Sequence, residues 1–308
     1  MAKRWFIVLI ICMVSVGAFA NDWVYLGQEP PGKTPQRLDP ISRNHLVHSS
    51  PTFSPDGTEI YWSEINKSDD DSHNIYFAKY TDGQWSDPAV APFSSSYHDN
   101  QPFISYDGQR LFFASLRPKL PGGDAGWDLW FCTKTGDGWS DPNVVNDGIG
   151  WWTPSLTRNH TLYFMDLIDD GHAEGYPENA PGIFRSEFHE GIYTSPELLP
   201  ESINGKSSFD WTPFIAADES YLIFSSDRAG GYGSGDLYIS FRDEKGQWGQ
   251  AINLGPTINT KEQERFPGVS PDGKYLFFTR WLGPPHYHDL YWVDASVIHD
   301  LKKTFQEN

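Results

Sequence analysis

Five residues at one recurring position carry the side chains best suited to chemistry. Each stands three residues before a proline that anchors a strand-like motif, and three of the five are carboxylates. If the motif repeats around a closed ring, equivalent positions lie at equivalent heights, so these side chains could converge near the mouth of a central channel. The five residues are His48, Asp99, Trp151, Asp210 and Glu264.

Two kinds of chemistry suit such a ring. Carboxylates and an imidazole could hold Ca²⁺, or Mn²⁺ and Zn²⁺ if His45 or His98 joined them. They could equally supply the acids and bases of glycan cleavage. The structural alternative is that residues entering an inner strand hydrogen-bond to the backbone of a neighbouring repeat, and no metal-ligand spacing motif is present.

A second recurring set consists of arginines that follow an apolar strand in three of the repeats, Arg117, Arg228 and Arg280. A guanidinium binds a carboxylate or sulfate bidentately, as a uronic-acid glycan would require. The structural alternative is a salt bridge to the aspartate that opens a neighbouring third strand. A separate metal candidate is the local cluster of His286, His288 and Asp289.

The repeat that positions these residues is clearest at 266–280, where a strand, a turn and a second strand follow one another. Pro271-Asp272-Gly273 is a tight-turn signal between aromatic, β-rich flanks. The anchoring prolines are separated by 51, 52, 59 and 54 residues, and each unit carries four strand signals. A period near fifty with four strands is typical of a propeller blade. The anchors are Pro51, Pro102, Pro154, Pro213 and Pro267.

The sequence therefore predicts an all-β chain forming a single β-propeller of five four-stranded blades, which start near residues 48, 99, 151, 210 and 264. Six blades are the alternative if residues 21–47 contain more than one strand. The fifth unit stops without its outer strand. Residues 33–40 resemble that missing strand, so we expect them to close the ring and leave no sheet edge open.

The first 20 residues have the pattern of a secretory signal peptide, with Lys3 and Arg4 before an apolar run and small residues at its end. We expect residues 21–308 to form the propeller in the periplasm or outside the cell, without a membrane span. Only Cys132 then remains, which excludes an intramolecular disulfide. The formal net charge of −18 argues against a nucleic-acid partner.

Two turn motifs carry a family resemblance. Ser54-Pro55-Asp56-Gly57 and Ser270-Pro271-Asp272-Gly273, with the Asp-Leu-Tyr triplets of the third strands, resemble the WD40-like PD40 repeats of TolB-type β-propellers. The resemblance covers essentially the whole mature chain, although the third repeat lacks the turn motif. It implies the fold, whereas such repeats occur in envelope proteins, peptidase propellers and sugar-acting propellers alike.

No motif of a nucleophilic enzyme or of a phosphate-binding loop is present. We therefore expect an exported binding or scaffold module of the cell envelope, with a protein or glycan ligand at the channel mouth. The alternative is a polysaccharide-degrading enzyme, a lyase or glycoside hydrolase, with the first set as acids, bases or ligands and the arginines as uronate binders. No cofactor is expected, although a divalent cation would be compatible.

Overall fold

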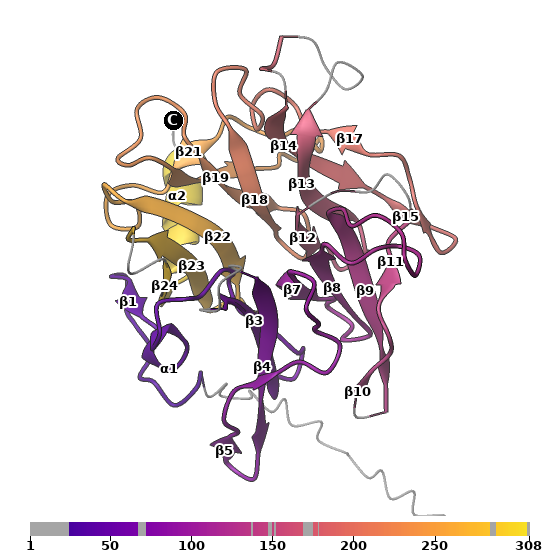
Figure 1. Ribbon diagram of the computed structural model, residues 1–308. Helices are drawn as coiled ribbons and strands as arrows, with labels where there is room; N and C mark the ends of the chain where they lie inside the picture. The colour runs from indigo at the N-terminus through magenta and orange to yellow at the C-terminus, as the bar shows by residue number, and fades with distance from the viewer. Residues whose placement is uncertain are drawn as a thin grey trace, which may run out of the picture.

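The computed structural model is a ring of antiparallel sheets around a central axis (Figure 1). It describes residues 25–66, 72–136, 138–146, 150, 152–168, 175–177, 179–283 and 288–306. The predicted signal peptide and two candidate site residues, Trp151 and His286, lie outside these ranges. The described residues form five blades, as predicted, and the six-bladed alternative is wrong.

Each blade places one strand toward the axis and adds the others outward. The inner strands are β2 (Thr52–Phe53), β7 (Asn100–Ile104), β12 (Trp152–Leu156), β18 (Asp210–Ile215) and β22 (Gln263–Val269). The second strands are β3 (Glu59–Ile65), β8 (Arg110–Ser115), β13 (Leu162–Ile168), β19 (Tyr221–Ser226) and β23 (Tyr275–Trp281). The third strands are β4 (His73–Thr81), β9 (Asp128–Thr135), β14 (Ala180–Ser186), β20 (Asp236–Phe241) and β24 (His288–Asp294).

The outer strands are short. They are β6 (Ala89–Val90), β11 (Asn143–Val144), β17 (Glu197–Leu198), β21 (Ile252–Asn253) and β1 (Gln36–Arg37). Two further two-residue strands pair with the ends of third strands: β5 (Gln84–Trp85) with β4 and β10 (Gly138–Trp139) with β9. After β14, β15 (Phe188–His189) and β16 (Ile192–Tyr193) pair with each other as a separate two-stranded sheet. The described residues also contain two helices, α1 (Asp39–Ser42) and α2 (Ser296–Gln306). No helix in these ranges is both long and apolar enough to span a bilayer.

The ring closes as the sequence predicts. Strand β1 pairs antiparallel with β24, so that Gln36 lies opposite Trp292 and Arg37 opposite Tyr291. The next residue, Leu38, is 1% exposed and donates its backbone N–H to the carbonyl of Leu290 at 2.8 Å. The N-terminal segment therefore supplies both an outer strand and a core side chain to the last blade.

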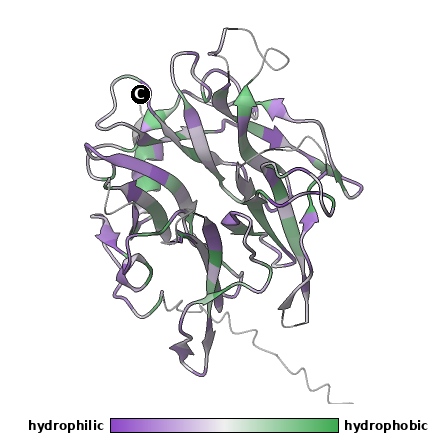
Figure 2. Ribbon diagram, in the orientation of Figure 1, coloured by the Kyte–Doolittle hydropathy of each residue, from purple (hydrophilic) through white to green (hydrophobic). Residues whose placement is uncertain are grey.

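The core is divided among the interfaces between blades. Five hydrophobic clusters fill them, and each cluster draws residues from two neighbouring sheets. Phe277 packs toward blade 1, whereas its neighbour Phe278 packs toward blade 4, because successive side chains of a strand point to opposite faces. Both faces of each sheet are buried, which explains the continuous apolar runs in the second strands (Figure 2).

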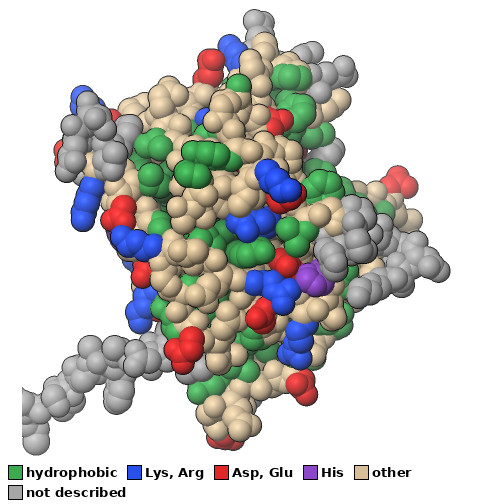
Figure 3. Space-filling model, turned by 90° about the vertical axis from the view of Figure 1, so that its left-hand side faces the viewer, with side chains coloured by type: hydrophobic (Ala, Val, Ile, Leu, Met, Phe, Trp, Pro, Cys, Tyr) green, Lys and Arg blue, Asp and Glu red, His purple; other side chains and the backbone are tan. Residues whose placement is uncertain are grey.

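The two ends of the ring differ. Because neighbouring strands are antiparallel, the loops that enter the inner strands and the loops that leave the second strands lie at one end, which we call the mouth face. The Ser-Pro-Asp-Gly turns lie at the other end, the turn face; there Asp56 Oδ1 accepts the N–H of Thr58 at 3.0 Å. Seen from the side, acidic and basic side chains are interspersed without a broad patch of one sign (Figure 3).

Candidate functional site

The three carboxylates of the first predicted set and the three arginines of the second lie at the mouth face, but they pair with each other. Asp99 Oδ1 lies 2.7 Å from Arg117 Nη2 within blade 2. The same pairing joins Asp210 to Arg228 at 2.7 Å in blade 4 and Glu264 Oε1 to Arg280 Nε at 2.8 Å in blade 5. The carboxylate side chains are 0%, 1% and 0% exposed, respectively. We call each pair a clip.

The clips hold loops in place. In blade 4, Asp210 Oδ2 accepts the N–H of Gly205 at 2.8 Å and the hydroxyl of Ser208 at 3.0 Å. Arg228 Nη2 also donates to the carbonyl of Ile203 at 2.7 Å. Each clip thus ties the loop entering an inner strand to the end of the second strand. The structural alternative for the arginines predicted a salt bridge to the aspartate that opens a neighbouring third strand. That partner is wrong, because each arginine pairs with the carboxylate of its own blade.

The remaining predicted residues do not form one cluster. Asp289 accepts from His45 Nδ1 at 2.5 Å and lies 3.6 Å from Arg37 Nη1. His288, its neighbour in β24, instead lies near His48, with ring centroids 5.4 Å apart. Adjacent strand residues point to opposite faces, so His288 and Asp289 diverge. Within the described ranges, no three His, Cys, Asp or Glu side chains are arranged to hold a metal ion.

The mouth face carries a second arrangement, which begins one residue beyond the clips. Arg265 follows Glu264 and Trp211 follows Asp210, and the two side chains meet across neighbouring blades. Arg265 Cζ lies 5.9 Å from the ring centroid of Trp211 and 5.1 Å from that of Phe266. Phe266 in turn lies 5.0 Å from the ring of His48.

This series of contacts continues around the ring. His48 lies 4.4 Å from His73, and His73 lies 5.7 Å from His98. Trp127 follows at 6.2 Å and Trp152 at a further 5.4 Å. The eight side chains run from blade 4 through blades 5, 1 and 2 to blade 3, and we call them the mouth belt: Trp211, Arg265, Phe266, His48, His73, His98, Trp127 and Trp152.

Several polar atoms of the belt and of the adjacent His288 have no protein partner. The buried Nε of Arg265 makes no hydrogen bond, and no carboxylate of the described residues pairs with this side chain. Nδ1 of His48, both ring nitrogens of His73, Nδ1 of His288 and Nε1 of Trp211 are also buried without a partner. Most buried polar groups in proteins are hydrogen-bonded, so a cluster of exceptions requires an explanation.

Burial sets the charge of this cluster. Desolvation lowers the pKa of His73 to about 4, with a smaller contribution from His98, and lowers that of His288 to about 3, with help from Arg265. The pKa of His48 also falls well below its usual value through burial and the neighbouring His73. Burial lowers the pKa of Arg265 to about 10. At neutral pH His48, His73 and His288 are therefore neutral and Arg265 is charged.

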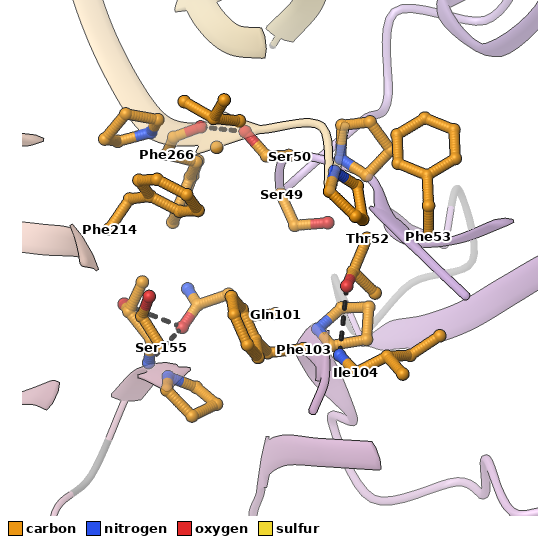
Figure 4. A pocket seen from close by; sticks show the side chains of 18 of the residues that line it. Ser49, Ser50, Thr52, Phe53, Gln101, Phe103, Ile104, Ser155, Phe214 and Phe266 are labelled. Carbon is orange, nitrogen blue, oxygen red and sulfur yellow. Dashed lines mark hydrogen bonds between the residues drawn. The ribbon is translucent and has the colours of Figure 1, made fainter. Parts of the chain in front are cut away.

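Below the belt, toward the turn face, the channel forms a chamber (Figure 4). About 670 Å³, including open solvent, lies between the five anchoring prolines and aromatic residues such as Phe53 and Phe214. Side-chain hydrogen bonds join neighbouring inner strands across it. Thr52 Oγ1 accepts the N–H of Ile104 at 2.9 Å, and Ser50 donates to the carbonyl of Phe266. The chamber wall therefore combines prolines and aromatic rings with hydroxyl groups, some of which tie neighbouring inner strands together.

The belt and the chamber meet at strained backbone. In four blades the residue before the anchoring proline has a left-handed φ between +50° and +54°, and the strand register shifts there. A residue before proline normally adopts an extended conformation, and a left-handed non-glycine residue costs about 1–3 kcal/mol. The resulting bulge changes which side chains of the inner strand face the belt and which face the chamber. The four residues are Gln101, Thr153, Thr212 and Phe266.

The belt and its surroundings can perform three chemical tasks. Arg265 can neutralise a carboxylate, and the indole faces can stack on apolar faces of a sugar. The neutral imidazoles can donate or accept hydrogen bonds, or accept a proton. Its eight side chains include no carboxylate, so they do not supply the carboxylate pair on which most glycoside hydrolases rely.

The comparisons with known proteins give distant similarities alone. No family model matches the chain, and no curated protein matches it. Among solved structures, a GH43 endo-arabinanase from Bacillus licheniformis matches with a TM-score of 0.46 and 14% identity over 86% of this chain and 96% of that one. A Trypanosoma rangeli sialidase in complex with sialic acid gives 0.45 and 12%, over 91% and 62%.

A puromycin-hydrolysing peptidase from Mycobacterium tuberculosis gives a TM-score of 0.42 and 13% identity over 82% of this chain. The chain spans 46% of the length of that peptidase and 33% of a similar prolyl endopeptidase. At these TM-scores and identities the likeness carries no conclusion about the family or the activity. Any inference about the activity therefore depends on the geometry of the mouth face.

Proposed function

We propose that this protein is an exported, PD40-like propeller that binds an acidic carbohydrate at the mouth belt. One observation carries the proposal: Arg265 is partly buried, lacks a carboxylate partner within the described residues, and is surrounded by aromatic rings. Placing a guanidinium there without a counter-charge is unfavourable for folding. A ligand carboxylate would remove that penalty and form the bidentate pair that arginine favours.

The neighbours of Arg265 suit a sugar that carries the carboxylate, such as a uronic acid. Trp127 and Trp152 are partly exposed and offer apolar faces, while the partly exposed imidazoles of His48 and His98 can bond to sugar hydroxyls. The loops around the belt add exposed aromatic side chains on the mouth face, and exposed apolar side chains commonly mark binding surfaces. These are Tyr97, Tyr232 and Trp281.

Binding measurements with paired sugars test the proposal. We expect the purified protein to bind uronic-acid glycans on a glycan array, and to bind galacturonate in calorimetry more tightly than galactose. Arg265→Met should abolish this preference. Arg242→Met is the matched control, because Arg242 pairs with Glu219 at the turn face. Equal binding of galactose and galacturonate, or unchanged binding by Arg265→Met, would refute it. Export to the periplasm or beyond is part of the proposal and rests on the signal-peptide pattern.

A second candidate function is elimination on the same ligand. A lyase needs a base for the proton next to the uronate carboxylate and a cation to stabilise the enolate that forms. The ring of Phe266 contacts both His48 and Arg265, so an imidazole that can accept a proton lies near the cation. This favours a lyase over a hydrolase, whose carboxylates are held in clips here. Unsaturated uronate, detected by its ultraviolet absorbance, would establish the lyase, and intact oligosaccharide after long incubation would exclude it.

A further inference from the structure

A polar groove lies on the mouth face over blade 4, outside the belt. It encloses about 910 Å³, open solvent included, and none of its lining residues belongs to the belt. Its walls come from the loop that enters blade 4, from the loop that leaves β19 and from the segment that precedes β21. Among its lining residues are Ser202, Lys206, Ser207, Ser208, Arg228 and Gln250.

The groove is built on rigid elements. The blade 4 clip lies at its base, since Asp210 binds both Gly205 and Ser208 and its partner Arg228 lines the groove. On another side, Ser202 Oγ donates to the carbonyl of Trp248 at 3.2 Å. The loop is therefore ordered before a ligand arrives, which reduces the entropy lost on binding.

The side chains at the rim of the groove are available to a ligand. Lys206 is 48% exposed, and its carboxylate neighbour Glu201 lies 3.9 Å away, a surface pair that contributes little. Phe209, directly after the groove residue Ser208, is 42% exposed. Its backbone is nevertheless fixed, because its N–H donates to Asp227 Oδ1 at 2.7 Å. An exposed aromatic side chain on a fixed backbone, next along the chain to a groove with an ammonium group and hydroxyls, suits an acidic sugar.

The groove is linked to the belt through the chain, because Asp210 binds its loop and Trp211 is the next residue. Phe209 and Asp210 are followed by Trp211, the blade 4 end of the belt, and Trp211 contacts Arg265. Resting on the proposed function, we infer that the groove is an outer subsite for the next sugars of the same acidic chain. Phe209 stacks on a sugar face, Lys206 pairs with a second carboxylate, and Ser207 and Gln250 bind hydroxyls. The ligand is then an oligosaccharide rather than a single uronic acid.

Chain-length dependence tests this inference. Calorimetry with mono-, di- and trigalacturonate, and with the matching alginate oligomers, should show about tenfold tighter binding of the trimer than of the monomer, equivalent to about 1.4 kcal/mol. The double variant Lys206→Ala, Phe209→Ala should reduce this ratio to below about threefold and leave monomer affinity unchanged. Lys261→Ala, Leu120→Ala is the matched control, since it removes another exposed lysine and another exposed apolar side chain.

The outcomes separate the two proposals. Equal affinity for monomer and trimer, or a ratio that survives the groove variant, would overturn the outer subsite while the role of Arg265 stands. A control variant that lowers the ratio as much as the groove variant would also overturn it. Absence of binding to every uronate, or monomer binding that Arg265→Met leaves intact, would overturn the proposed function and this inference with it.

Discussion

Replacing Arg265 by methionine should stabilise the protein while it removes ligand binding. Arg265 contacts Trp211 and Phe266 but pairs with no carboxylate of the described residues. Methionine keeps an unbranched, flexible side chain between the two rings and removes the charge. Most substitutions at partly buried positions lower stability, so a gain here would be specific to an unpaired cation.

The expected gain follows from the electrostatics. Burial lowers the pKa of Arg265 to about 10, which corresponds to a penalty of roughly 3 kcal/mol on the charged form. The side chain is only partly buried, and its contacts with the rings contribute about 0.5–2 kcal/mol that the variant loses in part. We therefore expect the free energy of unfolding to rise by about 1 kcal/mol, or about 2 °C in melting temperature.

Urea unfolding at neutral pH, followed by tryptophan fluorescence, measures this change. Arg228→Met is the matched control, because the same substitution there leaves the buried carboxylate of Asp210 without its cation. That control should lose about 3–5 kcal/mol. The two variants thus shift stability in opposite directions. If Arg265→Met lost more than about 1 kcal/mol, the cation would be stabilised in the free protein, and the argument for a ligand carboxylate would fail.

Three further predictions follow from the same structure. Stability should fall as the pH drops from about 6.5 toward 5, because His73 and His288 have pKa values of about 4 and 3 in the fold but about 6.5 when unfolded, so the unfolded chain binds more protons. The free energy of unfolding should change by up to about 1.4 kcal/mol per pH unit for each histidine. An unchanged melting temperature from pH 7 to 5 would contradict this prediction. Leu38→Ala should cost about 2–5 kcal/mol in chemical denaturation, since this buried side chain secures the closing strand, whereas Leu120→Ala, at an exposed position, should cost almost nothing. Burial raises the pKa of the Cys132 thiol to about 12, so a thiol reagent should label it only as fast as the protein unfolds, and rapid labelling of the native protein would show that the thiol is accessible.

The fold was predictable because local patterns encode it. Anchoring prolines, turn motifs and aromatic runs recur with a period near fifty, and each pattern specifies a strand or a turn without reference to distant residues. Closure was predictable for a related reason: the fifth unit lacks an outer strand and residues 33–40 resemble one. The pairing of Gln36 with Trp292 confirms this.

The site was harder to predict, because Trp211 and Arg265 of the belt each lie one residue beyond a carboxylate that the sequence suggests. The sequence directs attention to Asp99, Asp210 and Glu264 because carboxylates suggest chemistry. A clip signal was nevertheless present, since Arg117 and Arg228 each stand 18 residues after their partners and Arg280 stands 16 after its own. By contrast, the left-handed backbone before the prolines has no sequence signature, because residues before proline are normally extended. Because the bulge could not be predicted, the direction of the neighbouring side chains could not be predicted either.

The clips also explain why the belt is asymmetric. Where a blade supplies an arginine after its second strand, the carboxylate three residues before the proline is used for structure. In blade 1, Asn66 stands in the place of that arginine and donates to Ser72 Oγ at 2.8 Å. His48 therefore has no partner of that kind and packs against His73 and Phe266 instead. In a repeat without a clip, the residue three positions before the proline can face the mouth. In blade 1 this residue is His48, and its ring lies near Phe266, which also contacts Arg265. The side chains with unpartnered nitrogens consequently gather where blades 5 and 1 meet.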